Sequence, residues 1–172
     1  FFVGGILLLE RGEGVLSAFA VSPLPPGEYL FARVVTLSVL ATVETLVIGV
    51  AITGASLDVA LFVIGAFALS IIFSCSGFAF FSRYAGLNEA LLPSVLATVA
   101  LSLPAIALAS SAPFVAWNLH PTHAAMQLVA LAFGMPQSFG AIETLSLVAW
   151  IAGTAAVARA AARRLLATAE LQ

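Results

Sequence analysis

The chain contains four long apolar stretches, each about as long as a helix that crosses a bilayer. They lie at residues 29–54, 59–81, 90–109 and 139–160. A hydrocarbon core about 30 Å thick requires roughly 20 apolar helical residues. Because hydrocarbon offers no hydrogen-bond partners, backbone that crosses it forms helices or a closed barrel. We therefore predict an all-α, polytopic transmembrane helical bundle that occupies residues 1–172 as a single domain.

The composition supports this prediction and limits the classes of partner that we expect. Hydrophobic residues make up 62% of the chain and charged residues only 8%, whereas soluble domains carry about 25% charged residues. All six basic residues are arginines, and they form no basic patch typical of nucleic-acid binding. We expect membrane lipid around the chain and no nucleic-acid partner. Residues 1–9 are typical of the end of a further membrane helix, so we expect an N-terminal portion upstream.

The arginines fall on one side of the membrane if the helices alternate in direction. The connector 10–28, the connector 82–89 and the C-terminal tail 161–172 then share a side that holds every arginine: Arg11, Arg33, Arg83, Arg159, Arg163 and Arg164. The connectors 55–58 and 110–138 on the opposite side hold none. By the positive-inside rule, the arginine side faces the cytoplasm. The prediction is a multi-pass protein of the inner (plasma) membrane with a cytoplasmic C-terminus.

The connector 10–28 is charged and rich in proline. We predict a short helix from Val15 to Val21, ended at Ser22-Pro23 because the residue before a proline is disfavoured in the helical region. The result is a stiff apolar projection between two spans. Two interpretations remain open: an amphipathic loop that lies on lipid, or a docking helix that enters a groove on a partner.

The connector 110–138 is long enough to hold short helices of its own. We predict a helix at 124–133, capped by Thr122 and ended at Gly134 and Pro136. It is half a bilayer long at 1.5 Å per residue. Either it dips into the membrane and returns, or the connector is an interfacial loop. Ahead of it, Pro104 is expected to kink the preceding span.

Four of the ionisable residues in or near the spans are candidates for a functional site. Glu44, near the middle of 29–54, is expected to face the bundle interior, either in a translocation path or in an interhelical hydrogen bond. Glu143 either lines an outer gate or complements the dipole of the last helix. His120, His123 and Glu143 suggest a zinc site only weakly, because the spacing lacks a second ligand motif.

The segment around 10–28 resembles the cytoplasmic coupling segment of ABC-2-type transporter permeases. The positions that carry the resemblance are Glu10, Arg11, Gly14, Leu16, Ser22, Pro23, Leu24, Tyr29, Leu30 and Arg33. The stretch from Leu119 to His123 is similar to the outer region of fluoroquinolone-export permeases. The resemblance implies six spans, of which this chain holds the end of helix 2 through helix 6, with short outer re-entrant or interfacial helices before the last.

The resemblance also implies a function. In that family the coupling segment contacts a separate ATP-binding subunit, and residues Glu10, Arg11, Gly14, Leu16, Phe19 and Pro23 would form that contact. Without a lysine, the chain cannot hold a GxxxxGK[ST] phosphate loop, so ATP would bind on the partner and the chain would need no cofactor of its own.

A second permease copy or paralogue, and a hydrophobic drug or lipid-like cargo, complete the prediction. The chain would be a transport permease and not an enzyme. Two alternatives from other classes remain: a membrane-embedded metal-dependent enzyme that uses His120, His123 and Glu143, and a non-transporting membrane scaffold.

Overall fold

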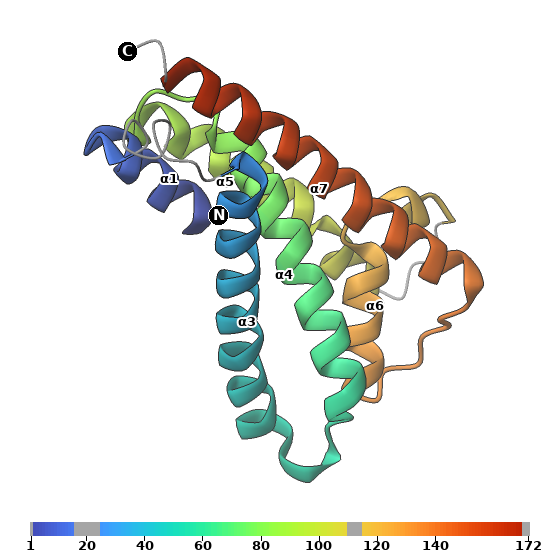
Figure 1. The fold of residues 1–172 in the computed structure, drawn as a ribbon. Helices are drawn as coiled ribbons and strands as arrows, with labels where there is room; N and C mark the ends of the chain where they lie inside the picture. Colours follow the sequence, from blue (N-terminus) through green and yellow to red (C-terminus); the bar gives the residue numbers. More distant parts are fainter. Residues whose placement is uncertain (1, 16–24, 110–114, 170–172) are drawn as a thin grey trace.

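The computed structural model describes residues 2–15, 25–109 and 115–169. Every regular element in this part of the chain is a helix (Figure 1). The elements are α1 (Phe2–Gly12), α3 (Pro26–Thr53), η1 (Gly54–Ser56), α4 (Val59–Phe81), α5 (Leu87–Ala109), η2 (Val115–Leu119), α6 (His123–Ala132) and α7 (Ala141–Ala169). The fold is an all-α bundle, as the apolar stretches predict.

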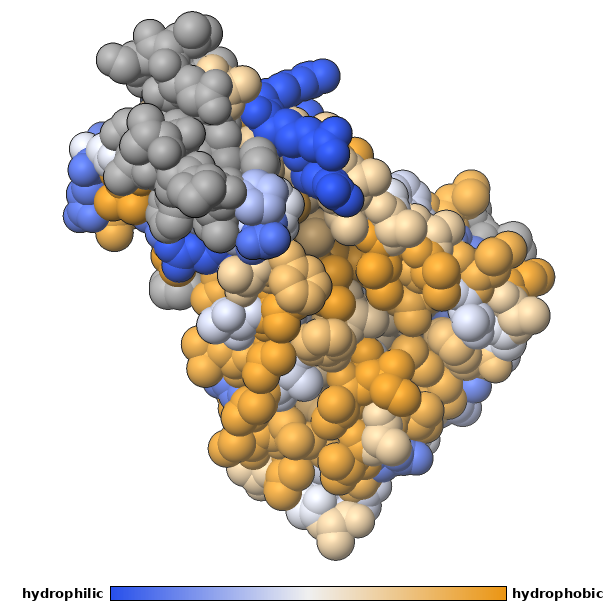
Figure 2. Space-filling model, in the orientation of Figure 1, coloured by the Kyte–Doolittle hydropathy of each residue, from blue (hydrophilic) through white to orange (hydrophobic). Residues whose placement is uncertain are grey.

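Four of these helices are long and apolar enough to cross a membrane. The qualifying segments are Gly27–Ser56, Val59–Phe81, Leu87–Ala109 and Ala141–Leu165. Figure 2 shows a broad apolar surface over the body of the molecule, with hydrophilic residues gathered at one end. That end holds the end of α1 and the end of α7 in Figure 1. The structure is that of a multi-pass membrane protein.

Local chemistry fixes the turn between α3 and α4. Gly54 follows α3 with φ of 63°, a left-handed conformation that favours glycine, and its N–H donates to the Val50 carbonyl. Asp58 caps α4, because its carboxylate accepts a hydrogen bond of 3.1 Å from the Leu61 N–H. The Asp58 N–H donates to the carbonyl of Ala132, which joins this turn to the end of α6.

α4 is the central helix of the bundle and packs against α1, α3, α6 and α7 (Figure 1). In the 18-residue apolar stretch of α4, 39% of the residues are buried inside the bundle, compared with 6% in the corresponding stretch of α5. At the arginine end, buried residues from five helices form one apolar cluster that includes Leu7, Tyr29, Phe78, Ala90 and Leu165. This cluster fixes where the ends of α1, α3, α4, α5 and α7 lie relative to one another.

The short helix α6 approaches α4 closely at Gly65. A β-carbon at Gly65 would lie 2.9 Å from Cβ of Leu128 and 3.0 Å from the backbone nitrogen of Val129. Small residues at helix contacts allow this kind of approach between membrane helices. The missing side chain of Gly65 therefore allows α6 to pack closely against α4.

Several helix boundaries differ by a few residues from those expected from hydropathy, and two of them have a clear local cause. α3 begins at Pro26, which suits the first turn because its fixed φ is already helical and its missing N–H has no role there. α7 runs to Ala169 and not to residue 160, because the alanine-rich end favours helix although it is charged. The extended α7 carries Arg159 and Arg163 alongside the start of α3.

Candidate functional site

Glu10, the first residue of the segment that resembles a coupling segment, is held at the end of α1 by two residues of α3. Glu10 is only 8% exposed, and its carboxylate forms an ion pair with Arg33 on α3. The Tyr29 hydroxyl donates a hydrogen bond to the second carboxylate oxygen of Glu10. The Arg33 guanidinium also lies over the Tyr29 ring, 5.8 Å from its centroid. Glu10, Tyr29 and Arg33 form what we call the motif cluster.

The next motif residue connects α1 to the turn between α4 and α5. The Arg11 guanidinium donates a hydrogen bond of 2.9 Å to the backbone carbonyl of Tyr84. The Phe80 and Tyr84 rings contact each other beside this turn in a tilted arrangement, with their centroids 5.1 Å apart. Neighbouring residues of the motif therefore fix α1 to two different parts of the bundle.

The motif cluster lies at both flanks of the connector that the sequence singles out. After α1, Gly14 adopts φ of 73°, which turns the chain at the start of that connector. Pro25 and Pro26 begin α3 at its other end. The remaining candidate coupling residues Leu16, Phe19 and Pro23 lie outside the described residues.

Glu44 does not face the bundle interior. Its side chain is exposed on α3 and lies at the rim of a groove of about 400 Å³ between α1, α3 and α4. Ser70 and Ser74 of α4 line the same groove. Within the described residues the Glu44 carboxylate has no recorded hydrogen bond or ion pair. The interhelical hydrogen bond considered as its structural role is thus not formed in this part of the chain.

The segment between α5 and α6, which we call the outer connector, contacts the part of α5 that contains Pro104. Pro104 has no N–H, so the helix leaves the carbonyl of Ala100 without its usual donor. Nε2 of His120 lies 3.1 Å from that carbonyl oxygen. The Thr122 hydroxyl donates a hydrogen bond of 2.6 Å to the next carbonyl, that of Leu101. Thr122 occupies the N-cap position of α6, as expected, but its hydroxyl makes no capping hydrogen bond there and bonds to α5 instead.

The imidazole of His120 has a defined proton arrangement. Donation from Nε2 to the Ala100 carbonyl leaves Nδ1 to accept from the Thr122 N–H at 3.4 Å. Burial lowers the pKa of His120, and the hydrogen bond to Ala100 opposes this shift. Burial likewise lowers the pKa of His123, the neighbouring His120 lowers it further, and Glu143 raises it. Both imidazoles therefore favour the neutral form.

The three residues considered as zinc ligands, His120, His123 and Glu143, do not form a metal site within the described residues. The Glu143 carboxylate accepts a hydrogen bond of 2.9 Å from the Gly140 N–H, so it caps the start of α7. His123 is buried, with no partner for Nδ1 within the described residues. Among these residues, no group of three or more potential metal-ligating side chains comes together.

The fold and the motif cluster define a multi-pass helical membrane protein with charged, interlocked helix ends. A family described as "Fluoroquinolones export permease protein Rv2686c-like" matches residues 1–85, which is 85 of the 172 residues. The match supports a drug-export permease family assignment and a role as a transport permease. It covers α1, α3 and α4 and includes the whole motif cluster. No curated protein and no solved structure matches the chain.

Sequence reasoning did not identify every part of this site. Tyr29 and Arg33 belong to the resemblance but were not chosen as site residues, and the Tyr29 hydroxyl turns out to contact Glu10. A tyrosine and an arginine one turn apart at the start of a membrane helix were the available signal. Their partner on α1 is 19 residues from Tyr29, and only the fold brings it into contact.

Proposed function

We propose that the chain is the permease subunit of an ATP-driven exporter, moved by a separate ATP-binding subunit that grips the connector between α1 and α3. The observation that carries the proposal is the motif cluster. Glu10 and Arg33 hold the two flanks of the connector together through an ion pair that is largely withdrawn from water. A force applied to the connector would therefore act on α1 and α3 as one unit.

Arg11 extends the same connection to α5. Its hydrogen bond to the Tyr84 carbonyl links α1 to the turn that leads into α5. Toward its other end α5 carries Pro104, and there His120 and Thr122 bond to the carbonyls of Ala100 and Leu101. Movement at the connector between α1 and α3 can thus reach the opposite end of the bundle through a single helix, α5.

The orientation in this proposal follows from the charges. All six arginines lie on connectors and helix ends that belong to one side of the alternating topology, and the positive-inside rule makes that side cytoplasmic. An ATP-binding subunit in the cytoplasm would then meet the connector directly. We propose that a second copy or paralogue of the permease covers part of the apolar outer surface.

For the cargo we propose a hydrophobic or amphiphilic drug, with a fluoroquinolone as the first test compound. The family description names that class, and the exposed helix surface is mainly apolar. The test is ATP-dependent fluoroquinolone uptake into inside-out vesicles that hold the permease and an ATP-binding subunit that co-purifies with it. The proposal expects uptake that stops when ATP is replaced by a non-hydrolysable analogue.

Phe19→Asp tests the coupling surface, and Ala55→Asp in η1 is the matched control at the opposite end. We expect Phe19→Asp to lose both the ATP-binding subunit and uptake, while Ala55→Asp retains both. Unchanged association of the Phe19→Asp protein would contradict the coupling assignment. ATP-independent uptake would contradict the proposed energy source.

A further inference from the structure

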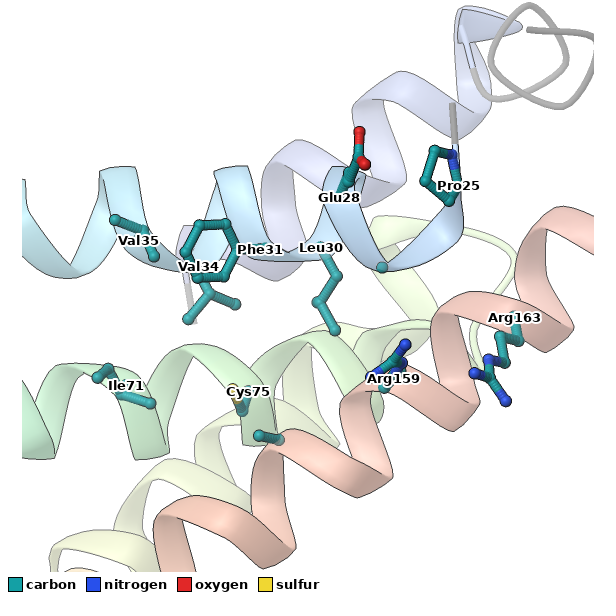
Figure 3. A pocket seen from close by; sticks show the side chains of 12 residues that line it. Pro25, Glu28, Leu30, Phe31, Val34, Val35, Ile71, Cys75, Arg159 and Arg163 are labelled. Atoms are coloured by element: carbon teal, nitrogen blue, oxygen red, sulfur yellow. The ribbon is translucent and has the colours of Figure 1, made fainter. Parts of the chain in front are cut away.

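A cavity of about 520 Å³ opens between α3, α4 and α7 at the arginine end of the bundle (Figure 3). Its volume lies within the range of roughly 300–1,000 Å³ seen for small-molecule sites. The motif cluster does not line it, and the transport proposal does not use it. One wall is apolar, and the other carries two arginines of α7.

The two arginines are arranged on one face of α7. Arg159 and Arg163 are four residues apart, so their side chains project from the same side of the helix. No ion pair with either arginine is recorded within the described residues. A β-carbon at Gly27 would lie 3.8 Å from Nε of Arg159, so this arginine passes directly over the first turn of α3.

Among the described residues that line the cavity, Glu28 on α3 is the only carboxylate, so the lining as a whole carries a net charge of +1 (two arginines minus one glutamate). Figure 3 shows the Glu28 carboxylate directed to the side of α3 away from α7. Within the described residues, no side chain at the cavity therefore neutralises the positive charge of Arg159 and Arg163. An anionic group would supply the missing partner.

The opposite wall is suited to hydrocarbon. Leu30, Val34 and Ile71 line it, and Phe31 at its edge is 68% exposed on the outer surface of α3. Because α3 is one of the four helices that can span the membrane, the exposed Phe31 beside the cavity would lie against lipid in a bilayer. A molecule with an anionic head and an apolar chain can place its head on the arginines and its chain along α3.

We propose that this cavity binds the headgroup of an anionic phospholipid. Basic pockets between membrane helices, close to the interface, recognise acidic lipid headgroups in this way. Arginine suits the role because its planar guanidinium can bind a phosphate with two hydrogen bonds. The apolar wall that continues onto the lipid-facing surface favours a phospholipid over a soluble anion, which would leave that wall uncovered.

The test is native mass spectrometry of the purified full chain in detergent, titrated with phosphatidylglycerol. Phosphatidylcholine and soluble glycerol phosphate are the comparison ligands. Arg159→Gln/Arg163→Gln removes the charges that line the cavity, and Arg164→Gln is the matched control because Arg164 does not line it. Ala155→Trp fills the cavity from α7 and leaves both arginines in place. Thermal unfolding confirms that each variant is folded.

We expect wild type and Arg164→Gln to retain phosphatidylglycerol at least tenfold better than the double variant and Ala155→Trp. Phosphatidylcholine and glycerol phosphate should bind at least tenfold more weakly than phosphatidylglycerol. Equal retention by the double variant, or an equal loss in Arg164→Gln, would overturn the proposal, as would equal binding of phosphatidylcholine. Displacement of the lipid by glycerol phosphate at equal concentration would also overturn it, by showing a site for a soluble anion.

Discussion

Arg33 on α3 forms an ion pair with Glu10 on α1, although 23 positions separate the two residues in sequence. Glu10 is nearly buried, while the Arg33 side chain is 35% exposed. The pair therefore fixes the spacing of the two helices on either side of the connector. It is the structural basis for treating the connector and both helices as one mechanical unit.

Breaking this pair from one side should be costly. Arg33→Met leaves the Glu10 carboxylate buried without a counter-charge, which costs about 3 kcal/mol of the free energy of unfolding, the lower end of the range for such pairs. The double variant Glu10→Met/Arg33→Met should recover most of this loss, because no charge is then left unpaired. Chemical denaturation of the four proteins in detergent measures the cycle.

The exposed Glu13→Gln is the control for these charge changes and should alter stability by less than about 0.5 kcal/mol. The double variant should fold yet lose ATP-dependent uptake, since the connector is no longer fixed to α3 by charge. Strictly additive costs in the cycle would show that Glu10 and Arg33 do not interact.

His120 and Pro104 should be energetically coupled. His120→Ala removes the donor to the Ala100 carbonyl and should cost about 1 kcal/mol. In a Pro104→Ala background, the backbone N–H gained at position 104 can satisfy that carbonyl within α5, so the same change should cost less. Thermal unfolding of the cycle measures the difference. An equal cost in both backgrounds would contradict the assignment of Ala100 as the shared acceptor.

Stability should fall as the pH drops through the range where free histidine titrates. The folded state lowers the pKa of both His120 and His123 below the usual 6.5. Between these lowered values and about pH 6.5, the unfolded chain binds more protons than the folded chain, so the free energy of unfolding decreases with falling pH. Above about pH 6.5 both states are neutral and the effect is absent.

His120→Gln/His123→Gln should flatten this part of the profile of melting temperature against pH, measured between pH 5 and pH 8. The single variants divide the effect between the two imidazoles. A wild-type melting temperature that rises as the pH falls from 7 to 5.5 would have the wrong sign for this account.

Glu44 offers a test that separates stability from transport. A charge near the middle of a membrane helix costs about 3 kcal/mol on insertion scales, and the described residues give it no partner. Glu44→Gln should raise the melting temperature while it reduces uptake, if the carboxylate acts in the groove that Ser70 and Ser74 also line. Thr45→Val, at the neighbouring exposed position, is the control. Lower stability with normal uptake would identify Glu44 as a structural residue.

The helices could be predicted from sequence because hydrocarbon imposes one dominant rule on the whole chain. Val59–Phe81 is predominantly apolar and holds no charged residue, and the turns at Gly54 and Asp58 contain residues that suit helix ends. The direction in which Glu44 points could not be predicted in the same way. α3 is apolar on every side, so its sequence does not mark which face is turned inward.

Contacts between distant residues were likewise beyond the sequence. Pro104 predicts an unsatisfied carbonyl in α5, but the identity of its donor depends on how the outer connector folds back. The sequence places Arg159 and Arg163 only on the arginine side of the membrane, and the packing of α7 beside α3 shows that both line a cavity. In each case the residue type indicates that a polar partner is required, and only the packing of the helices shows where that partner can lie.

The central claim is that an ATP-binding subunit grips the connector between α1 and α3. A photoreactive amino acid placed at position 19, with position 55 in η1 as the opposite-end control, tests it most directly in intact membranes. The account predicts an adduct between position 19 and an ATP-binding protein, and none from position 55. Capture of that protein from position 55, or its absence from position 19, would contradict the account.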